Sequence, residues 1–135
     1  MAEVFVDTNV LVYAFDTADP VKQRVAQGVL ADNPRATIST QVMLEWFQVV
    51  TRKLATPLPI HAAAAVLADL ATMDVVSADA ELVTQAAALV LTENLSVWDA
   101  MIVTAASRAG CRTLLSEDLA AGATIAGVTI VNPFT

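Results

Sequence analysis

The chain has 135 residues, of which 14 are acidic and 7 basic, and its formal net charge at pH 7 is −7. An acidic surface does not attract phosphates broadly, so a role on nucleic acid would require bound cations or a local basic patch. The length fits one compact domain over residues 1–135. The single cysteine, Cys111, excludes an internal disulfide and a zinc site built from several cysteines.

Hydrophobic residues make up 56% of the chain, and the mean hydropathy is +0.62. No uncharged apolar run approaches the roughly 18 residues that a membrane-spanning helix needs. The first residues, Met1 to Val4, also lack the basic start of a signal peptide. We therefore expect a protein without a membrane anchor, and the lone cysteine favours a reducing, cytoplasmic location.

Short runs of β-branched and aromatic residues alternate with helical patterns along the chain. We expect strands at 4–6, 36–39, 113–116 and 128–131, with a shorter fifth at 75–76. We expect helices at 20–32, 41–54, 60–72, 79–92 and 97–109, with a short helical turn after Asp7 and another after Asp118. This alternation is typical of a parallel sheet covered on both faces. The sequence therefore predicts an α/β fold with three layers, α/β/α, and a mostly parallel central sheet of four to five strands.

Four acidic residues are expected at one edge of this sheet. In a parallel α/β sheet the carboxyl ends of the strands and the amino ends of the returning helices meet at the edge where ligands bind. Asp7 ends the first strand, Asp118 follows strand 113–116, and Asp99 lies in the first turn of helix 97–109. Glu45 lies in the second turn of helix 41–54. Neighbouring carboxylates repel one another, and a hard cation such as Mg²⁺ or Mn²⁺, which takes oxygen ligands, would relieve that repulsion.

Each of these acids also has an ordinary structural explanation. Asp7 and Asp118 could cap short helical turns, and Ser96 with Asp99 has the spacing of a capping box. Asp99 is, however, in phase with the apolar residues of its helix, which predicts an inward-facing carboxylate that needs a partner. Glu45 shares its helix face with other polar residues. Periodicity therefore leaves open whether Glu45 is a ligand or part of a solvated stripe.

Several other residues near these acids receive structural interpretations. Trp46, Phe47 and Trp98 have helical spacings that are typical of core packing. Glu117, which precedes Asp118, is interpreted as a solvated turn charge.

Five short motifs follow one another along the chain. They are Val4-Phe5-Val6-Asp7-Thr8-Asn9, Ser39-Thr40-Gln41 with Glu45, Trp98-Asp99-Ala100, Ser116-Glu117-Asp118-Leu119 and Val131-Asn132-Pro133-Phe134. In this order and spacing they resemble the PIN-domain ribonucleases, and among these the VapC-type toxins of toxin–antitoxin pairs. The resemblance covers essentially the whole chain.

The resemblance implies a metal-dependent endoribonuclease. It implies that Asp7, Glu45, Asp99 and Asp118 form an acidic quartet that binds Mg²⁺ or Mn²⁺ and directs a metal-activated water at an RNA phosphodiester. It also matches Asn9 and Ser116 to supporting positions of the family. The implied partners are an RNA substrate, a cognate antitoxin and a second copy of the chain in a homodimer. Because the chain is acidic, we expect the antitoxin to insert an Arg or Lys into the acidic cleft.

Two alternatives to a ribonuclease remain at this point. A non-catalytic partner-binding module could use the same acidic cleft to receive a basic segment. An aspartyl-phosphate phosphatase is suggested by a strand-terminal Asp7, but that chemistry needs a second aspartate at position 9, where this chain has Asn9. It also needs a phosphate-binding lysine, and the only lysines are Lys22 and Lys53. The binding module is therefore the stronger rival.

Overall fold

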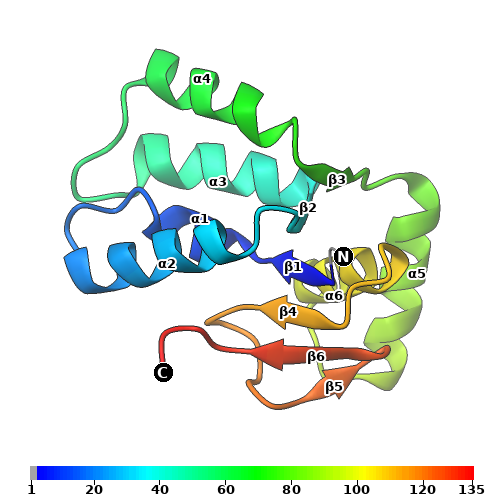
Figure 1. Cartoon of the computed structure of the whole chain (residues 1–135). Helices are drawn as coiled ribbons and strands as arrows, with labels where there is room; N and C mark the ends of the chain where they lie inside the picture. Colours follow the sequence, from blue (N-terminus) through cyan, green and yellow to red (C-terminus); the bar gives the residue numbers. More distant parts are fainter. Residues whose placement is uncertain (1–2) are drawn as a thin grey trace.

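The computed structural model describes residues 3–135, which form a six-stranded sheet with the strand order β3-β2-β1-β4-β6-β5 (Figure 1). The strands are β1 (Val4–Val6), β2 (Thr37–Ser39), β3 (Asp74–Val76), β4 (Thr113–Leu115), β5 (Thr124–Ile125) and β6 (Val128–Val131). The helices are α1 (Thr8–Tyr13), α2 (Pro20–Asp32), α3 (Thr40–Arg52), α4 (Ile60–Leu70), α5 (Ala80–Thr92) and α6 (Val97–Arg108). Met1 and Ala2, which the domain expected over 1–135 includes, lie outside the described residues.

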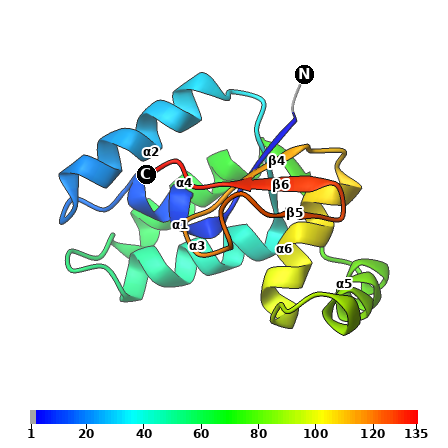
Figure 2. The same cartoon turned by 90° about the horizontal axis from the view of Figure 1, so that it is seen from below.

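Five of the six strands are parallel, and only the edge strand β5 runs antiparallel to its neighbour β6. Helices lie on both sides of the sheet, with α2 on one side and α5 and α6 on the other (Figure 2). This arrangement confirms the predicted α/β/α layers and the mostly parallel sheet. The expected count of four to five strands is wrong, because the two residues of β5 are too short to show an alternating pattern.

Local sequence signals place the helix ends. Asp19 caps α2, which begins at Pro20, and its carboxylate accepts a hydrogen bond from the Lys22 amide at 3.1 Å. The Ser39 hydroxyl caps α3 and the Ser96 hydroxyl caps α6 in the same way. Because these signals are local, the ends of the expected helices differ from the observed ones by two residues at most.

The helical turn expected after Asp118 does not form, and residues 117–119 make bends. The hydroxyl of Ser116 accepts hydrogen bonds from the amides of Asp118 at 3.2 Å and of Leu119 at 3.3 Å. A side chain therefore satisfies the amides that a helix would have left free at its start.

The core lies between the sheet and its helices. Trp46 of α3 is fully buried, and its ring packs edge-to-face on Phe15 with the centroids 5.2 Å apart. Phe47 is partly buried against the same core. Both core predictions are confirmed, whereas that for Trp98 is wrong, since its side chain is 65% exposed. The buried stretch of α6 starts only at Ala100, so the indole in the first turn projects into solvent.

A two-residue turn of Ala126 and Gly127 joins β5 to β6, and both residues have positive φ angles, of 51° and 79°. Alanine is strained in this region, whereas asparagine adopts it readily. We expect Ala126→Asn to raise the free energy of unfolding by about 0.5–1 kcal/mol, measured by urea titration. The matched control is Ala120→Asn, at an exposed position with an ordinary φ, which should change stability little. A loss of stability in Ala126→Asn would contradict this account of the turn.

Within residues 3–135, no helix by itself has the length and hydropathy of a membrane span. Only α5 and α6 together reach those values, as a pair bent by 114°.

Candidate metal centre

The candidate site lies where the strand order changes direction. The chain runs from β1 outward to β2 and β3, and then returns to β4 on the other side of β1. In open α/β sheets, the carboxyl end of the strands at such a switch point is where ligands bind. Val6 pairs with Leu115 across β1 and β4, so that Asp7 and Ser116 leave the two strands side by side.

Asp7 is the buried acid of the site, with 7% of its surface exposed. Its carboxylate accepts a hydrogen bond from the Thr8 amide at 2.7 Å and another from the Ser116 hydroxyl at 2.8 Å. Burial raises the pKa of Asp7 from its usual 3.8 to about 6, although these two hydrogen bonds lower it. The charges of Asp118 and Glu45 raise the same pKa further. Asp7 therefore caps α1 and also shares an electrostatic environment with two other acids.

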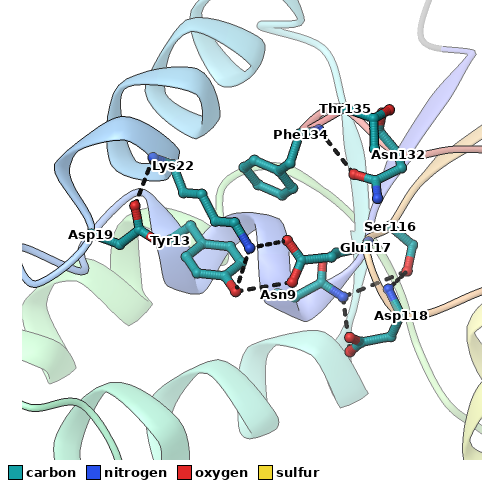
Figure 3. A network of polar contacts seen from close by, with 10 residues as sticks. All are labelled: Asn9, Tyr13, Asp19, Lys22, Ser116, Glu117, Asp118, Asn132, Phe134 and Thr135. Carbon is teal, nitrogen blue, oxygen red and sulfur yellow. Dashed lines mark hydrogen bonds and ion pairs between the residues drawn. The ribbon is translucent and has the colours of Figure 1, made fainter.

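Asn9 and Ser116 hold the loop that carries Asp118 (Figure 3). The Asn9 amide nitrogen donates to Asp118 Oδ2 at 3.1 Å and, more weakly, to Ser116 Oγ at 3.5 Å. The side-chain oxygen of Asn9, Oδ1, accepts from the Glu117 backbone amide at 3.1 Å. Ser116 is fully buried and Asp118 is exposed. These contacts fix a solvent-facing carboxylate beside Asp7.

Glu45 faces the same region from α3. The side-chain amide of Gln41 donates to Glu45 Oε1 at 2.7 Å and to the backbone carbonyl of Trp98 at 3.3 Å, which ties α3 to the start of α6. Glu45 and Asp118 both line an open pocket of about 370 Å³. The other residues that line it are Thr8, Asn9, Val12, Tyr13, Asp16, Val49 and Glu117. Glu45 thus faces a pocket together with Asp118, another acid of the set, and its role as a metal ligand stays a prediction.

Asp99 is less closely associated with the other three acids than the sequence predicts. It is half-buried in the first turn of α6, and its backbone amide donates to the Ser96 hydroxyl at 3.1 Å. Among the described residues its carboxylate neither completes the capping box nor contacts Asp7, so the inward orientation expected for it is only partly met. As the side chains stand in residues 3–135, no three acids, histidines or cysteines lie close enough to enclose a metal ion. The structure groups Asp7, Glu45 and Asp118 electrostatically, and Asp99 is not part of that group.

The chemistry of this edge nevertheless fits a hard divalent cation. Its acids offer only oxygen ligands, and a cation would offset the like charges that raise the pKa of the buried Asp7. Two buried oxygens at the same edge, Thr8 Oγ1 and Gln41 Oε1, have no hydrogen-bond partner within the part of the chain that the structure describes. Buried oxygens of this kind are normally paired with protein, water or an ion.

Glu117 is not the solvated turn charge that the sequence suggests. Its carboxylate lies 2.6 Å from Lys22 Nζ of α2 and accepts a hydrogen bond from the Tyr13 hydroxyl at 3.0 Å. Lys22 and Tyr13 did not emerge as site residues from the sequence, because no pattern links residues 13 and 22 to residue 117. The weak signal was that Lys22 is one of only two lysines in the chain.

Another pocket, of about 550 Å³, lies between α5, α6 and the turn at Ala126. None of the four acids lines it. Arg108 in this pocket forms an ion pair with Asp79 at 3.0 Å. This ion pair serves below as a control for the ion pair of Lys22 and Glu117.

Several solved structures share this fold. A toxin–antitoxin complex from Klebsiella pneumoniae is 21% identical, with a TM-score of 0.73 over 96% of this chain and 97% of that one. VapC20 of Mycobacterium tuberculosis, a toxin that cleaves the sarcin–ricin loop, is 20% identical, with a TM-score of 0.66 over 82% and 86% of the two chains. The DNA-bound VapBC of Salmonella typhimurium is 17% identical, with a TM-score of 0.66 over 96% and 97%. No curated protein sequence matches the chain significantly.

The family model described as PIN domain matches residues 4–122. The match includes all four acids and both supporting residues, and it agrees with the resemblance seen in the sequence motifs. Since it spans most of the chain and the solved structures share the fold, this chain belongs to the PIN domain family.

Proposed function

We propose that this chain is a metal-dependent endoribonuclease and the toxin of a toxin–antitoxin pair. The observation that carries the proposal is the grouping of Asp7, Glu45 and Asp118 at the switch point of a PIN fold. VapC20 of Mycobacterium tuberculosis, which has the same fold, cleaves the sarcin–ricin loop. This supports RNA as the substrate class.

Asp7, Glu45, Asp99 and Asp118 would hold the ion, Mg²⁺ or Mn²⁺. When bound, the ion lowers the pKa of a water and offsets negative charge on the phosphodiester. Asp7 and Asp118 would act as carboxylate ligands, and Asn9 and Ser116 keep them in place through the hydrogen bonds described above. The Ser116 hydroxyl is buried and donates to Asp7, so we assign it a supporting role and not that of a nucleophile.

Metal dependence tests this proposal directly. We expect the purified chain to cleave single-stranded or looped RNA with Mg²⁺ or Mn²⁺, to stop in excess EDTA, and to resume when Mn²⁺ is restored. Asp118→Asn should lower the rate by about 100-fold or more, because several kcal/mol of transition-state stabilisation depend on the ion. Arg108→Met, which changes the distant ion pair, is the matched control and should cleave normally. Undiminished cleavage in EDTA would contradict the mechanism.

The proposed protein partner is an antitoxin that inserts an Arg or Lys into the acidic cleft. The net charge of −7 favours a cationic segment, and the complexes from Klebsiella pneumoniae and Salmonella typhimurium show this fold with antitoxins bound. A homodimer and a cytoplasmic location remain predictions. If the unaltered chain bound its antitoxin but cleaved no RNA with either ion, the non-catalytic binding module would be the better description.

A further inference from the structure

A compact polar cluster lies next to the acidic edge, outside the quartet itself. Lys22 Nζ contacts Glu117 Oε2 at 2.6 Å and the Tyr13 hydroxyl oxygen at 3.2 Å, and that hydroxyl donates to Glu117 Oε1 at 3.0 Å (Figure 3). Both oxygens of the Glu117 carboxylate are therefore held from the side of α1 and α2. The pair is partly shielded from water, since the side chains of Lys22 and Glu117 are 33% and 25% exposed.

The C-terminal segment covers this cluster. The Phe134 amide donates to Asn132 Oδ1 at 2.9 Å, which turns the chain so that the Phe134 ring packs edge-to-face on Tyr13, with the centroids 5.0 Å apart. Lys22 Nζ lies 4.6 Å from the centre of the Tyr13 ring and 5.6 Å from that of Phe134, in the range of cation–π contacts. The motif Asn132-Pro133-Phe134 thus supports the lysine from its other side.

Glu117 stands between two residues of the acidic edge, Ser116 and Asp118. If its carboxylate were free, it would add another negative charge to an edge where like charges already raise the pKa of Asp7. A Glu117 side chain released from Lys22 and Tyr13 would also leave the loop 116–118 held by fewer contacts, chiefly the hydrogen bonds from the Glu117 amide to Asn9 and from the Asp118 amide to Ser116.

We propose that Lys22 and Tyr13 are positioning residues that hold Glu117 toward α2 and so fix the loop 116–118 in the orientation that presents Asp118 to the metal. We call Lys22, Tyr13 and Glu117 the clamp. The inference rests on the proposed function of the acidic edge, because it assigns the clamp a role at that same site. Lys22 touches neither Asp7 nor Asp118 in the described contacts and acts only through Glu117.

Lys22→Met separates this role from simple electrostatics, because the two predict changes in Mn²⁺ affinity of opposite sign. Removing a positive charge near a cation site strengthens Mn²⁺ binding by Coulomb's law alone. Releasing Glu117 and the loop weakens Mn²⁺ binding, and groups that support metal ligands typically contribute about 10–100-fold in affinity or activity. The direction of the change is therefore the decisive result.

The experiment titrates the full chain with Mn²⁺ and follows free Mn²⁺ by electron paramagnetic resonance. We expect Lys22→Met to bind Mn²⁺ about 10-fold more weakly, and Tyr13→Phe, which removes one hydroxyl, to lose less. Lys22→Arg should recover most of the affinity, because a guanidinium can also bond the Glu117 carboxylate. The double variant Lys22→Met/Glu117→Gln should be no weaker than Lys22→Met alone, since both changes break one unit. Arg108→Met is the matched ion-pair control, and melts in EDTA establish that every variant is folded.

RNA kinetics on the same proteins provide a second readout. The clamp predicts that Lys22→Met lowers kcat with little change in KM for RNA. Tighter or unchanged Mn²⁺ binding in Lys22→Met overturns the proposal, and so does a higher KM with unaltered Mn²⁺ affinity, which would make Lys22 a phosphate contact. If the unaltered chain cleaves no RNA but the Mn²⁺ results are as expected, the clamp stands and the proposed ribonuclease activity fails.

Discussion

Asp7→Asn is expected to abolish RNA cleavage and to stabilise the metal-free chain at neutral pH. Burial raises the pKa of Asp7 from 3.8 to about 6, so the ionised carboxylate is disfavoured in the folded state. This penalty is absent below the unfolded pKa of 3.8, grows as the pH rises, and is complete above about 6. At about 1.4 kcal/mol per pKa unit, the full penalty is of the order of 3 kcal/mol.

Asparagine removes the charge and keeps one of the two hydrogen bonds of Asp7. Its oxygen can accept from the Thr8 amide or from the Ser116 hydroxyl, whereas the Ser116 oxygen, which already accepts from two backbone amides, has no lone pair left for the asparagine nitrogen. The lost hydrogen bond costs about 1 kcal/mol, so we expect a net gain of about 1–2 kcal/mol above pH 6 and a small loss near pH 4. Urea unfolding in EDTA across this pH range measures the difference. Asp69→Asn, on an exposed face of α4, is the matched control and should not reproduce the pH dependence. Lower stability of Asp7→Asn at neutral pH would contradict the burial cost assigned to Asp7.

Ser116→Ala is expected to slow cleavage at neutral pH and to move the acidic limb of the pH–rate profile upward. The hydroxyl donates to Asp7 at 2.8 Å and lowers its pKa, so its loss should raise that pKa above the present value of about 6. A larger share of Asp7 would then be protonated and unable to bind metal. We expect an activity loss of about 10–100-fold and, because buried hydrogen bonds are broken, a stability loss of about 1–3 kcal/mol.

Initial rates of RNA cleavage across the range from pH 5 to pH 8, together with urea unfolding, test both effects. Ser39→Ala is the matched control, because Ser39 is also buried and its hydroxyl also bonds a backbone amide, at the start of α3. It should lose about 1 kcal/mol of stability without shifting the pH profile. If Ser116→Ala has the profile of the unaltered chain, Ser116 serves only to hold the bend at 117–119.

The features that depend on neighbouring residues were predictable from the sequence. Strand-forming runs, helix periodicity and the caps at Asp19, Ser39 and Ser96 act over a few residues, so the elements and their ends could be predicted closely. Two exceptions concern helical turns. The Ser116 hydroxyl bonds the backbone amides of Asp118 and Leu119 in place of a helical turn, and the first turn of α6 leaves Trp98 in solvent.

The sequence by itself determined the α/β class and placed Asp7 and Asp118 at the ends of strands, because both follow from local pattern. Only the tertiary structure decided that β1 and β4 are neighbours, which joins Asp7 to Ser116 across 109 positions of sequence. It also placed Glu45 and Asp118 at one pocket, which Asp99 does not line, and paired Lys22 with Glu117 across 95 positions. Contacts over such separations depend on strand order and helix packing, and no short-range pattern in the sequence encodes them.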